Sequence, residues 1–205
     1  MSRTTERLER GVTLIELIIF IVIISSAVAG VLMTLDIAGR SSADPMIQKQ
    51  ALAVAEALLE EVQLQPFTYC DPDDPRAATA LSATYDPVDQ TNTCSTAAAI
   101  ETMGPEPIGL YGLETRNDTT KPFDNVNDYH GFGMGPGITD LTGAAITGLE
   151  KYSAGVVVAN PVAGQMLGTI PSSDTLFITV TVTGPASTTV VLHGYRVRYA
   201  PNAVP

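Results

Sequence analysis

The sequence Gly11-Val-Thr-Leu-Ile-Glu16 opens a long apolar segment, because the nineteen residues that follow, Leu17 to Leu35, carry no charge. As an α-helix, nineteen residues measure about 29 Å, close to the roughly 30 Å hydrocarbon core of a bilayer. This segment is therefore long and apolar enough to span a membrane.

Glu16 is the unusual residue of this segment, since it places an ionisable side chain near the start of the apolar helix. A charge in such a helix costs on the order of 2.5 to 3.5 kcal/mol at the centre and less near an end. We therefore expect Glu16 to have a partner. Arg3, Arg7 and Arg10 precede the span, so this end is expected in the cytoplasm and the C-terminal body outside it.

The run from Glu9 to Ile18 resembles the N-terminus of type IV prepilins and of the related pseudopilins of type II secretion systems. The shared features are a short charged leader ending in Gly, an apolar residue, Thr-Leu, an aliphatic residue and Glu, followed by a long apolar helix. The resemblance implies that a prepilin peptidase cleaves after Gly11 and methylates the amine of Val12, which leaves Glu16 as the fifth mature residue. The family most often begins its mature chain with Phe, where this chain has Val12.

Three further segments resemble the minor subunits of mannose-sensitive haemagglutinin pili, namely Arg40 to Met46, Ala55 to Glu61 and Phe67 to Pro72. Beyond about Asp74 this likeness becomes patchy. The N-terminal third of the chain thus carries the resemblance, which implies an inner-membrane protein that joins a filament with other pilin or pseudopilin subunits.

Two other interpretations fit part of the pattern. An ordinary signal peptide would use the arginines as its basic region and end at Ala27-Val-Ala29, before Gly30. Glu16 interrupts its apolar core, however, and the chain stays apolar through Leu35. A plain single-span anchor is the other interpretation, and it leaves Glu16 without a purpose. Gly11 and Glu16 together favour the pilin interpretation.

Composition limits the classes of partner. The chain of 205 residues suits one membrane helix and one compact domain, and its formal charge is −11. Removing residues 1–11, with three Arg and two Glu, leaves eight basic and twenty acidic side chains, hence −12. Such a surface repels nucleic acid, so no nucleic-acid partner is expected.

Cys70 and Cys94 are the only cysteines. In an oxidising periplasm such a pair is expected to form a disulfide, and in the chain-entropy model closing a loop of about 25 residues contributes on the order of 3.5 kcal/mol. A zinc or redox site is disfavoured, since Cys-x-x-Cys is absent from the sequence and His130 and His193 are isolated.

The residues after the span predict one α+β domain. A helix is expected to continue from the span, with a break or kink at Asp44-Pro45, and to end at Gln65-Pro66. Along its second half, apolar residues repeat at three- and four-residue steps: Ile47, Ala51, Ala55, Leu58, Leu59 and Val62. From Tyr69 to about Glu150 we predict long loops, with one short helix near residues 96–102.

Alternating residues predict strands in the C-terminal third. Thr175 to Thr183 places Leu176, Ile178, Val180 and Val182 on one face, and a turn at Gly184 to Ser187 leads to a second strand from Thr188 to Tyr199. Tyr152 to Ala159 supplies a third strand. The expected fold is a long helix packed against a mainly antiparallel sheet, with a leader at 1–11, a transmembrane and assembly helix at 12–35, and a periplasmic domain at 36–205.

Three loop segments contain residue types that occur in binding sites. Asp124 to Asp128, and a second acidic group of Asp71, Asp73 and Asp74, offer oxygen ligands that suit calcium, but neither matches the twelve-residue helix-loop-helix spacing, so solvated loops are expected. The glycine-rich run from Gly131 to Gly137 lacks a following Lys-Ser/Thr and is expected to be a flexible loop.

The sequence therefore predicts a structural subunit with no catalytic residues, metal or cofactor. It contains no nucleophile elbow, zinc-binding His pair or Cys/His signature. The prediction is a minor pilin that is cleaved after Gly11 and assembles through Glu16. A minor pseudopilin of a type II secretion system, or a membrane-anchored adhesin-like domain that uses the loops between Tyr69 and Glu150, remain as alternatives.

Overall fold

The structure, a computed structural model, describes residues 13–88, 91–107 and 112–204, with residues 37–44 described by their backbone alone. The chain divides into two compact units at Met46/Ile47. The expected globular domain began at residue 36, whereas the compact C-terminal unit begins at Ile47. The predicted cleavage and methylation residues, Gly11 and Val12, lie outside the described residues.

One helix, α1 (Leu14–Leu64), contains both the apolar segment and the amphipathic segment. The short break expected at Asp44-Pro45 is wrong, because α1 continues through Pro45, while the kink expected as its alternative stays a prediction. Proline removes one backbone hydrogen bond and crowds the preceding turn, but the turns on both sides keep their bonds. The helix ends where Gln65-Pro66 was predicted to end it.

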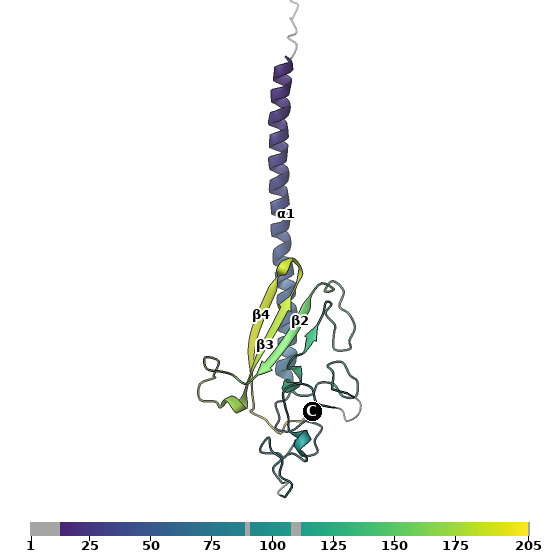
Figure 1. Cartoon of the computed structure of the whole chain (residues 1–205), viewed down its shortest axis with the longest axis vertical. Coiled ribbons are helices and arrows are strands. Elements are labelled where there is room, and N and C mark those ends of the chain that lie inside the picture. Colours follow the sequence, from purple (N-terminus) through teal and green to yellow (C-terminus); the bar gives the residue numbers. More distant parts are fainter. Residues whose placement is uncertain (1–12, 89–90, 108–111, 205) are drawn as a thin grey trace, which may run out of the picture. The chain divides into compact units, whose positions relative to one another are not determined.

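The strands confirm the predicted α+β layout. Within the described residues they form one antiparallel sheet in the order β1-β2-β3-β4, with β1 at Gly133–Met134, β2 at Ser153–Ala159, β3 at Thr175–Thr183 and β4 at Thr189–Val197. Figure 1 shows β2, β3 and β4 side by side. In the register, Val180 pairs with Val156 on one side and with Leu192 on the other.

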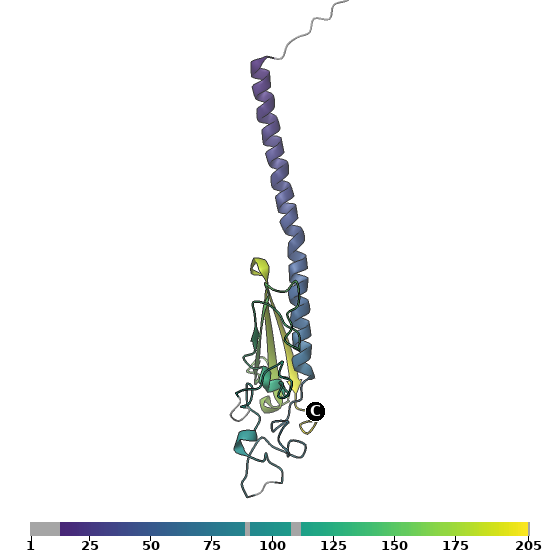
Figure 2. The same cartoon turned by 90° about the vertical axis from the view of Figure 1, so that its right-hand side faces the viewer.

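The second half of α1 covers one face of this sheet, as Figures 1 and 2 show. The predicted apolar face of β3 is fully buried, and the helix contributes the small and aliphatic residues Ala51, Ala55, Leu58 and Val62 to the same core. Small side chains let the helix approach the strands closely. At Gly194 of β4 an added Cβ would lie 2.5 Å from Nε2 of Gln63, so this position has no room for a side chain unless Gln63 moves.

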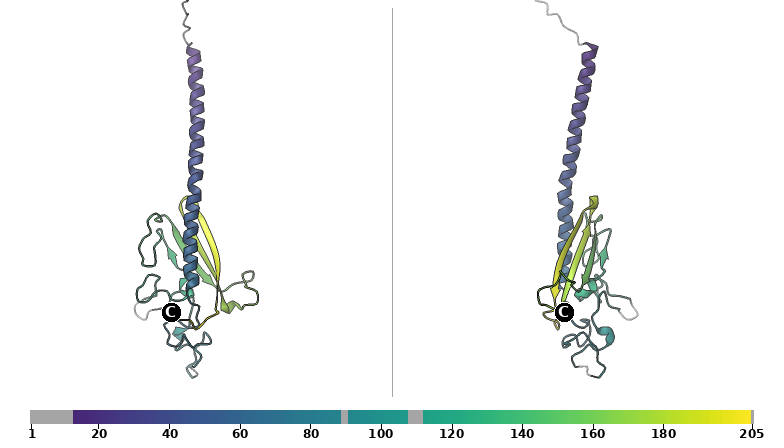
Figure 3. Two further views of the ribbon diagram at one scale, coloured as in Figure 1. Left: turned by 180° about the vertical axis from the view of Figure 1, so that it is seen from behind. Right: turned by 60° about the vertical axis from the view of Figure 1, so that its left-hand side comes forward.

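The connections from Tyr69 to Glu150 are mostly irregular, as expected, and the view from behind in Figure 3 shows them beside the sheet. The predicted short helix near residues 96–102 is the 3-10 helix η1 (Ala97–Ala99). The remaining 3-10 helices of the described chain are η2 (Val126–Tyr129), η3 (Ser172–Asp174) and η4 (Pro185–Ser187), the last within the predicted turn.

Two expectations for the loops are wrong. The glycine-rich run is not simply a flexible loop, because Gly133 and Met134 pair with Gly155 and Ala154 and form β1. The Asp124 to Asp128 segment is not a solvated loop, because Asn125, Asn127 and Asp128 are buried and the segment contains η2. Local side-chain hydrogen bonds stabilise this turn, as described below.

Candidate functional site

The N-terminal segment of α1 is the first candidate site. Leu14–Asp36 is long and apolar enough to cross a membrane, a property shared by anchors and signal sequences, and none of its side chains is buried within the chain. Glu16 lies in the first turn of this helix and is exposed. Among the described residues, no side chain forms an ion pair with its carboxylate.

Thr13 positions the start of this helix. Its Oγ1 accepts a hydrogen bond from the backbone N–H of Glu16 over 3.3 Å, and its carbonyl oxygen accepts from Leu17 over 3.2 Å. Thr13 is therefore an N-cap residue and Glu16 occupies the third helical position, where negative charge also favours the helix dipole. The Thr-x-x-Glu spacing, which is that of a capping box, is the sequence signal that predicts this start of the helix.

The predicted disulfide is present between Cys70 and Cys94, whose Cα atoms are 5.6 Å apart. It lies in a small second core with Ala77 and Ala80, separate from the core between the helix and the sheet. The C-terminal tail closes this core, since Nδ2 of Asn202 donates to the carbonyl oxygens of Ala77 and Ala80. The disulfide thus organises the loops on which several acidic side chains lie.

A cluster of five carboxylates is the second candidate site. Carboxylate oxygens of Glu101, Glu106 and Asp128 all lie within 4.8 Å of one another, and those of Glu114, Asp124 and Asp128 form a second such group. Asp128 is common to both groups. We call Glu101, Glu106, Glu114, Asp124 and Asp128 the carboxylate cluster.

Backbone contacts explain why residues so far apart in the sequence meet here. Val126 N–H donates to the carbonyl oxygen of Pro66, which fixes η2 against the end of α1. Gly104 N–H donates to the carbonyl oxygen of Asn127, so the segment that carries Glu101 and Glu106 runs beside η2. Glu114 N–H donates to the carbonyl oxygen of Glu106, which brings these two residues together.

Asp128 has a structural role as well. Its Oδ2 accepts hydrogen bonds from the backbone N–H groups of Asn125 at 2.8 Å and Asp124 at 3.0 Å, while the side chain of Asn125 caps η2 in return. Nδ2 of Asn125 also donates to Oγ1 of Thr68 over 2.7 Å. This reciprocal capping fixes the position of the Asp128 carboxylate.

The cluster is deeply buried except for Asp124, which is half-buried. Exposed fractions are 8% for Glu101, 6% for Glu106, 4% for Glu114 and 0% for Asp128. Burial raises the pKa of Glu106 to about 9, of Glu114 to about 8 and of Asp124 to about 7, and the neighbouring carboxylates add to each shift. Burial, followed by the charge of Glu106, raises the pKa of Glu101 well above its ordinary value.

The second acidic group predicted from the sequence is divided by the structure. Asp71 and Asp73 lie near Asp124, but Asp73 is paired with Lys121. Asp74 lies elsewhere and accepts backbone N–H groups from Arg76 and Ser95. Sequence reasoning thus found Asp124 and Asp128 but missed Glu101, Glu106 and Glu114, since their spacing gives no sign that they converge.

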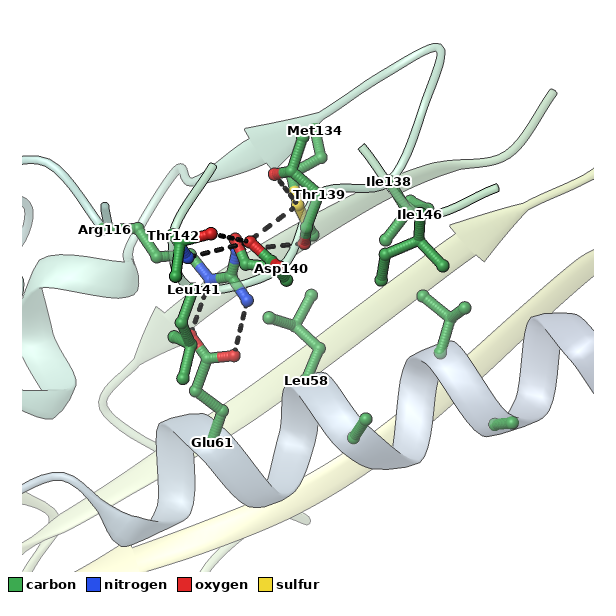
Figure 4. Close-up of a pocket in the computed structure, with 13 residues that line it drawn as sticks. Leu58, Glu61, Arg116, Met134, Ile138, Thr139, Asp140, Leu141, Thr142 and Ile146 are labelled. Atoms are coloured by element: carbon green, nitrogen blue, oxygen red, sulfur yellow. Dashed lines mark hydrogen bonds and ion pairs between the residues drawn. The ribbon is translucent and has the colours of Figure 1, made fainter. Parts of the chain in front are cut away.

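A groove of about 490 Å³ between α1 and the loop from Ile138 to Ile146 is the third feature, shown in Figure 4. Aliphatic side chains such as Leu58, Ile138 and Ile146 line it, and Glu61 and Arg116 form a bidentate ion pair at one end, with N···O distances of 2.6 and 2.8 Å. Arg116 also donates to the carbonyl oxygens of Thr139 and Asp140. Glu61 and Arg116 are therefore paired with each other, and the pair stabilises the fold.

Comparisons of the chain with protein-family models, curated proteins and solved structures found no match.

Proposed function

We propose that this chain is a filament subunit of the type IV pilin or pseudopilin class, and specifically a minor pilin. In this proposal the Leu14–Asp36 segment anchors the precursor in the inner membrane and later packs against neighbouring subunits. The observation that carries the proposal is Glu16, an acidic side chain without an ion-pair partner among the described residues, in the first turn of an exposed apolar helix.

The exposed side chains of this helix support the proposal. Leu17, Ile18, Ile19 and Phe20 follow one another at steps of about 100° around the helix, and each is between 52% and 61% exposed. Apolar residues on every side of a helix require an apolar environment on every side. Lipid supplies it before assembly, and the helices of neighbouring subunits supply it within a filament.

Glu16 gives this packing its register. In an apolar filament core an isolated carboxylate is costly, while a carboxylate paired with a cation is tolerated. Cleavage after Gly11 would create a new amine on Val12, and the amine of a neighbouring subunit is the partner that we assign to Glu16. The pair of Glu16 and this amine would fix the axial position of one subunit's helix relative to the N-terminus of the neighbouring subunit's helix.

The second half of α1 packs on the sheet and would carry the domain on the filament surface. The partners in this proposal are other pilin or pseudopilin subunits, the prepilin peptidase and the inner membrane. The domain lies in the periplasm before assembly, where the Cys70–Cys94 disulfide is stable.

The decisive experiment compares Glu16→Gln with Glu60→Gln, an exposed position in the second half of α1. The measured quantity is the amount of this subunit in sheared filaments divided by the amount in the inner membrane, in cells that make the wild-type major subunit. We expect Glu16→Gln to lower the ratio at least about tenfold, equivalent to about 1.4 kcal/mol, without loss of membrane insertion. The Glu60→Gln ratio should match wild type.

N-terminal analysis of the same samples tests processing. The mature chain should begin at Val12 and only in cells with an active prepilin peptidase. A start at Gly30 would replace the proposal with a secreted domain, and an uncut chain with an unchanged Glu16→Gln ratio would replace it with a simple anchor.

A further inference from the structure

The carboxylate cluster contains buried oxygens that the protein itself does not satisfy. Both carboxylate oxygens of Glu101, Oε2 of Glu114 and Oδ1 of Asp128 are buried and have no hydrogen-bond partner. Each of these three side chains is more than nine-tenths buried. Leaving a buried charged oxygen unpaired is among the more expensive arrangements in a folded protein, so it indicates a missing partner.

That partner is not a basic side chain of the described part of the chain. Lys121 pairs with Asp73 and Arg116 pairs with Glu61. Arg198, which lines the same cavity as Glu101, forms its ion pair with Asp174, and its buried Nε makes no hydrogen bond to the cluster. A proton is the simplest alternative, since a protonated Glu106 can donate a hydrogen bond to Asp128. One proton satisfies one contact, however, and leaves both oxygens of Glu101 unpaired.

The spacing of the oxygens suits a metal ion. Calcium binds six to eight oxygens at about 2.3 to 2.6 Å, so two ligands on opposite sides of the ion lie about 4.6 to 5.2 Å apart. All three carboxylates of each group fall within 4.8 Å of one another, which is inside one coordination sphere. The cluster also lacks the nitrogen and sulfur ligands that zinc favours.

We propose that the carboxylate cluster binds a calcium ion, with Asp128 as the central ligand, Glu101 and Glu106 on one side, and Glu114 and Asp124 on the other. The carboxylates attach the ion to three separate loops and to η2, which the Pro66 contact fixes to the end of α1. Calcium would therefore stabilise the loop region that no regular sheet supports. Magnesium is a poorer fit, because it retains several waters and demands octahedral geometry.

The test uses the full-length chain in detergent micelles, stripped of metal with EDTA and dialysed. Calcium chloride is then titrated by isothermal titration calorimetry, and thermal unfolding is followed by circular dichroism with and without the ion. Calcium should bind stoichiometrically and raise the midpoint of unfolding by about 3 to 6 °C at roughly ten times its dissociation constant. Magnesium chloride at equal concentration should have a clearly smaller effect.

Glu101→Gln is the sharpest variant, because neither oxygen of Glu101 has a protein hydrogen bond to lose. It removes one ligand and one buried ionisable carboxyl together. The calcium-dependent shift should disappear, while the metal-free variant should unfold at a higher temperature than the metal-free wild type. A side chain with a merely structural role would not produce these opposite effects.

Glu150→Gln is the matched control, since Glu150 is exposed and accepts a single backbone hydrogen bond from Gly148. It should keep the wild-type response to calcium. The proposal is overturned if calcium neither binds nor raises the unfolding temperature of the wild-type chain. It is equally overturned if Glu101→Gln and Glu114→Gln both keep the full shift, or if magnesium produces a shift as large as that of calcium.

Discussion

Thr13 caps the helix whose third residue is Glu16, through a 3.3 Å hydrogen bond from the backbone N–H of Glu16 to Oγ1 of Thr13. This hydrogen bond uses the backbone of Glu16, so the cap does not depend on the Glu16 side chain. Glu16→Gln therefore leaves the cap in place. Pairing with an amine, in contrast, requires the charge of Glu.

The first prediction separates the helix cap from the charge of Glu16 by comparing Thr13→Val with Glu16→Gln. Thr13→Val removes the capping hydroxyl at a cost of about 0.5 to 2 kcal/mol but keeps the shape of the side chain and the charge of Glu16. Incorporation into filaments should stay within about twofold of wild type for Thr13→Val, while Glu16→Gln lowers it about tenfold. The ratio of filament to membrane subunit is the measurement, and equal losses in both variants would contradict a specific role for the charge of Glu16.

The second prediction concerns the disulfide, which is the centre of the smaller core. Replacing both cysteines, Cys70→Ser with Cys94→Ser, avoids a free thiol and should lower the free energy of unfolding by roughly 2 to 5 kcal/mol. Urea denaturation of the full-length chain in detergent measures the change. As a control, thiol labelling of unfolded, unreduced wild-type protein should find neither cysteine reactive, and labelling of both would contradict the disulfide.

The third prediction concerns the ion pair at the end of the groove. The side chains of Arg116 and Glu61 are only 8% and 15% exposed, and Glu61 also accepts a hydrogen bond from Tyr129 Oη over 2.8 Å. Glu61→Gln leaves the Arg116 charge poorly compensated and should lower the free energy of unfolding by about 3 kcal/mol. Urea denaturation measures this loss.

Glu60→Gln, at the exposed neighbouring position, is the control for the third prediction. It should change the free energy of unfolding by less than about 0.5 kcal/mol. If the two variants are equally stable, the buried ion pair does not contribute to the fold in the way that its geometry indicates.

Periodic parts of the sequence predicted the fold well. Leu176 and Val180 alternate with polar residues, and this alternation identified both the strand and its buried face, because one face of a sheet meets the core. Ala51 and Val62 identified the packed face of the helix in the same way. Pro45 misled the prediction, since a local proline effect was outweighed by the intact turns around it.

The candidate site was only partly predictable, for a physical reason. Glu101, Glu106 and Glu114 lie on irregular connections, where no period relates sequence position to direction. Their convergence depends on individual backbone bonds, such as those from Gly104 to Asn127 and from Glu114 to Glu106. Such contacts follow from the whole fold, and no local pattern encodes them.

The last prediction is the pH dependence of the metal-free chain, and its sign follows from the raised carboxyl pKa values. Burial raises the pKa of Asp124 to about 7, of Glu114 to about 8 and of Glu106 to about 9, whereas unfolded carboxyls titrate near pH 4. Between about pH 4 and these raised pKa values, the folded chain therefore binds more protons than the unfolded chain. The stability that the protonated cluster contributes is complete below about pH 4, and it is lost as the pH rises through the pKa values of the folded chain.

In EDTA, the midpoint of thermal unfolding attributable to the cluster should therefore fall progressively from about pH 5 to about pH 9. The glutamine side chain of Glu106→Gln cannot ionise, so this variant should show a flatter decline of the unfolding midpoint with pH. Glu150→Gln is the control. The Gly148 N–H lowers the pKa of the exposed Glu150 carboxyl, so its replacement should leave the decline between pH 5 and 9 unchanged. The measurement is the difference in unfolding midpoint between each variant and wild type at several pH values. A wild-type chain that becomes more stable between pH 5 and 9 relative to Glu106→Gln would show that the Glu106 carboxyl is ionised, and not protonated, in the metal-free fold.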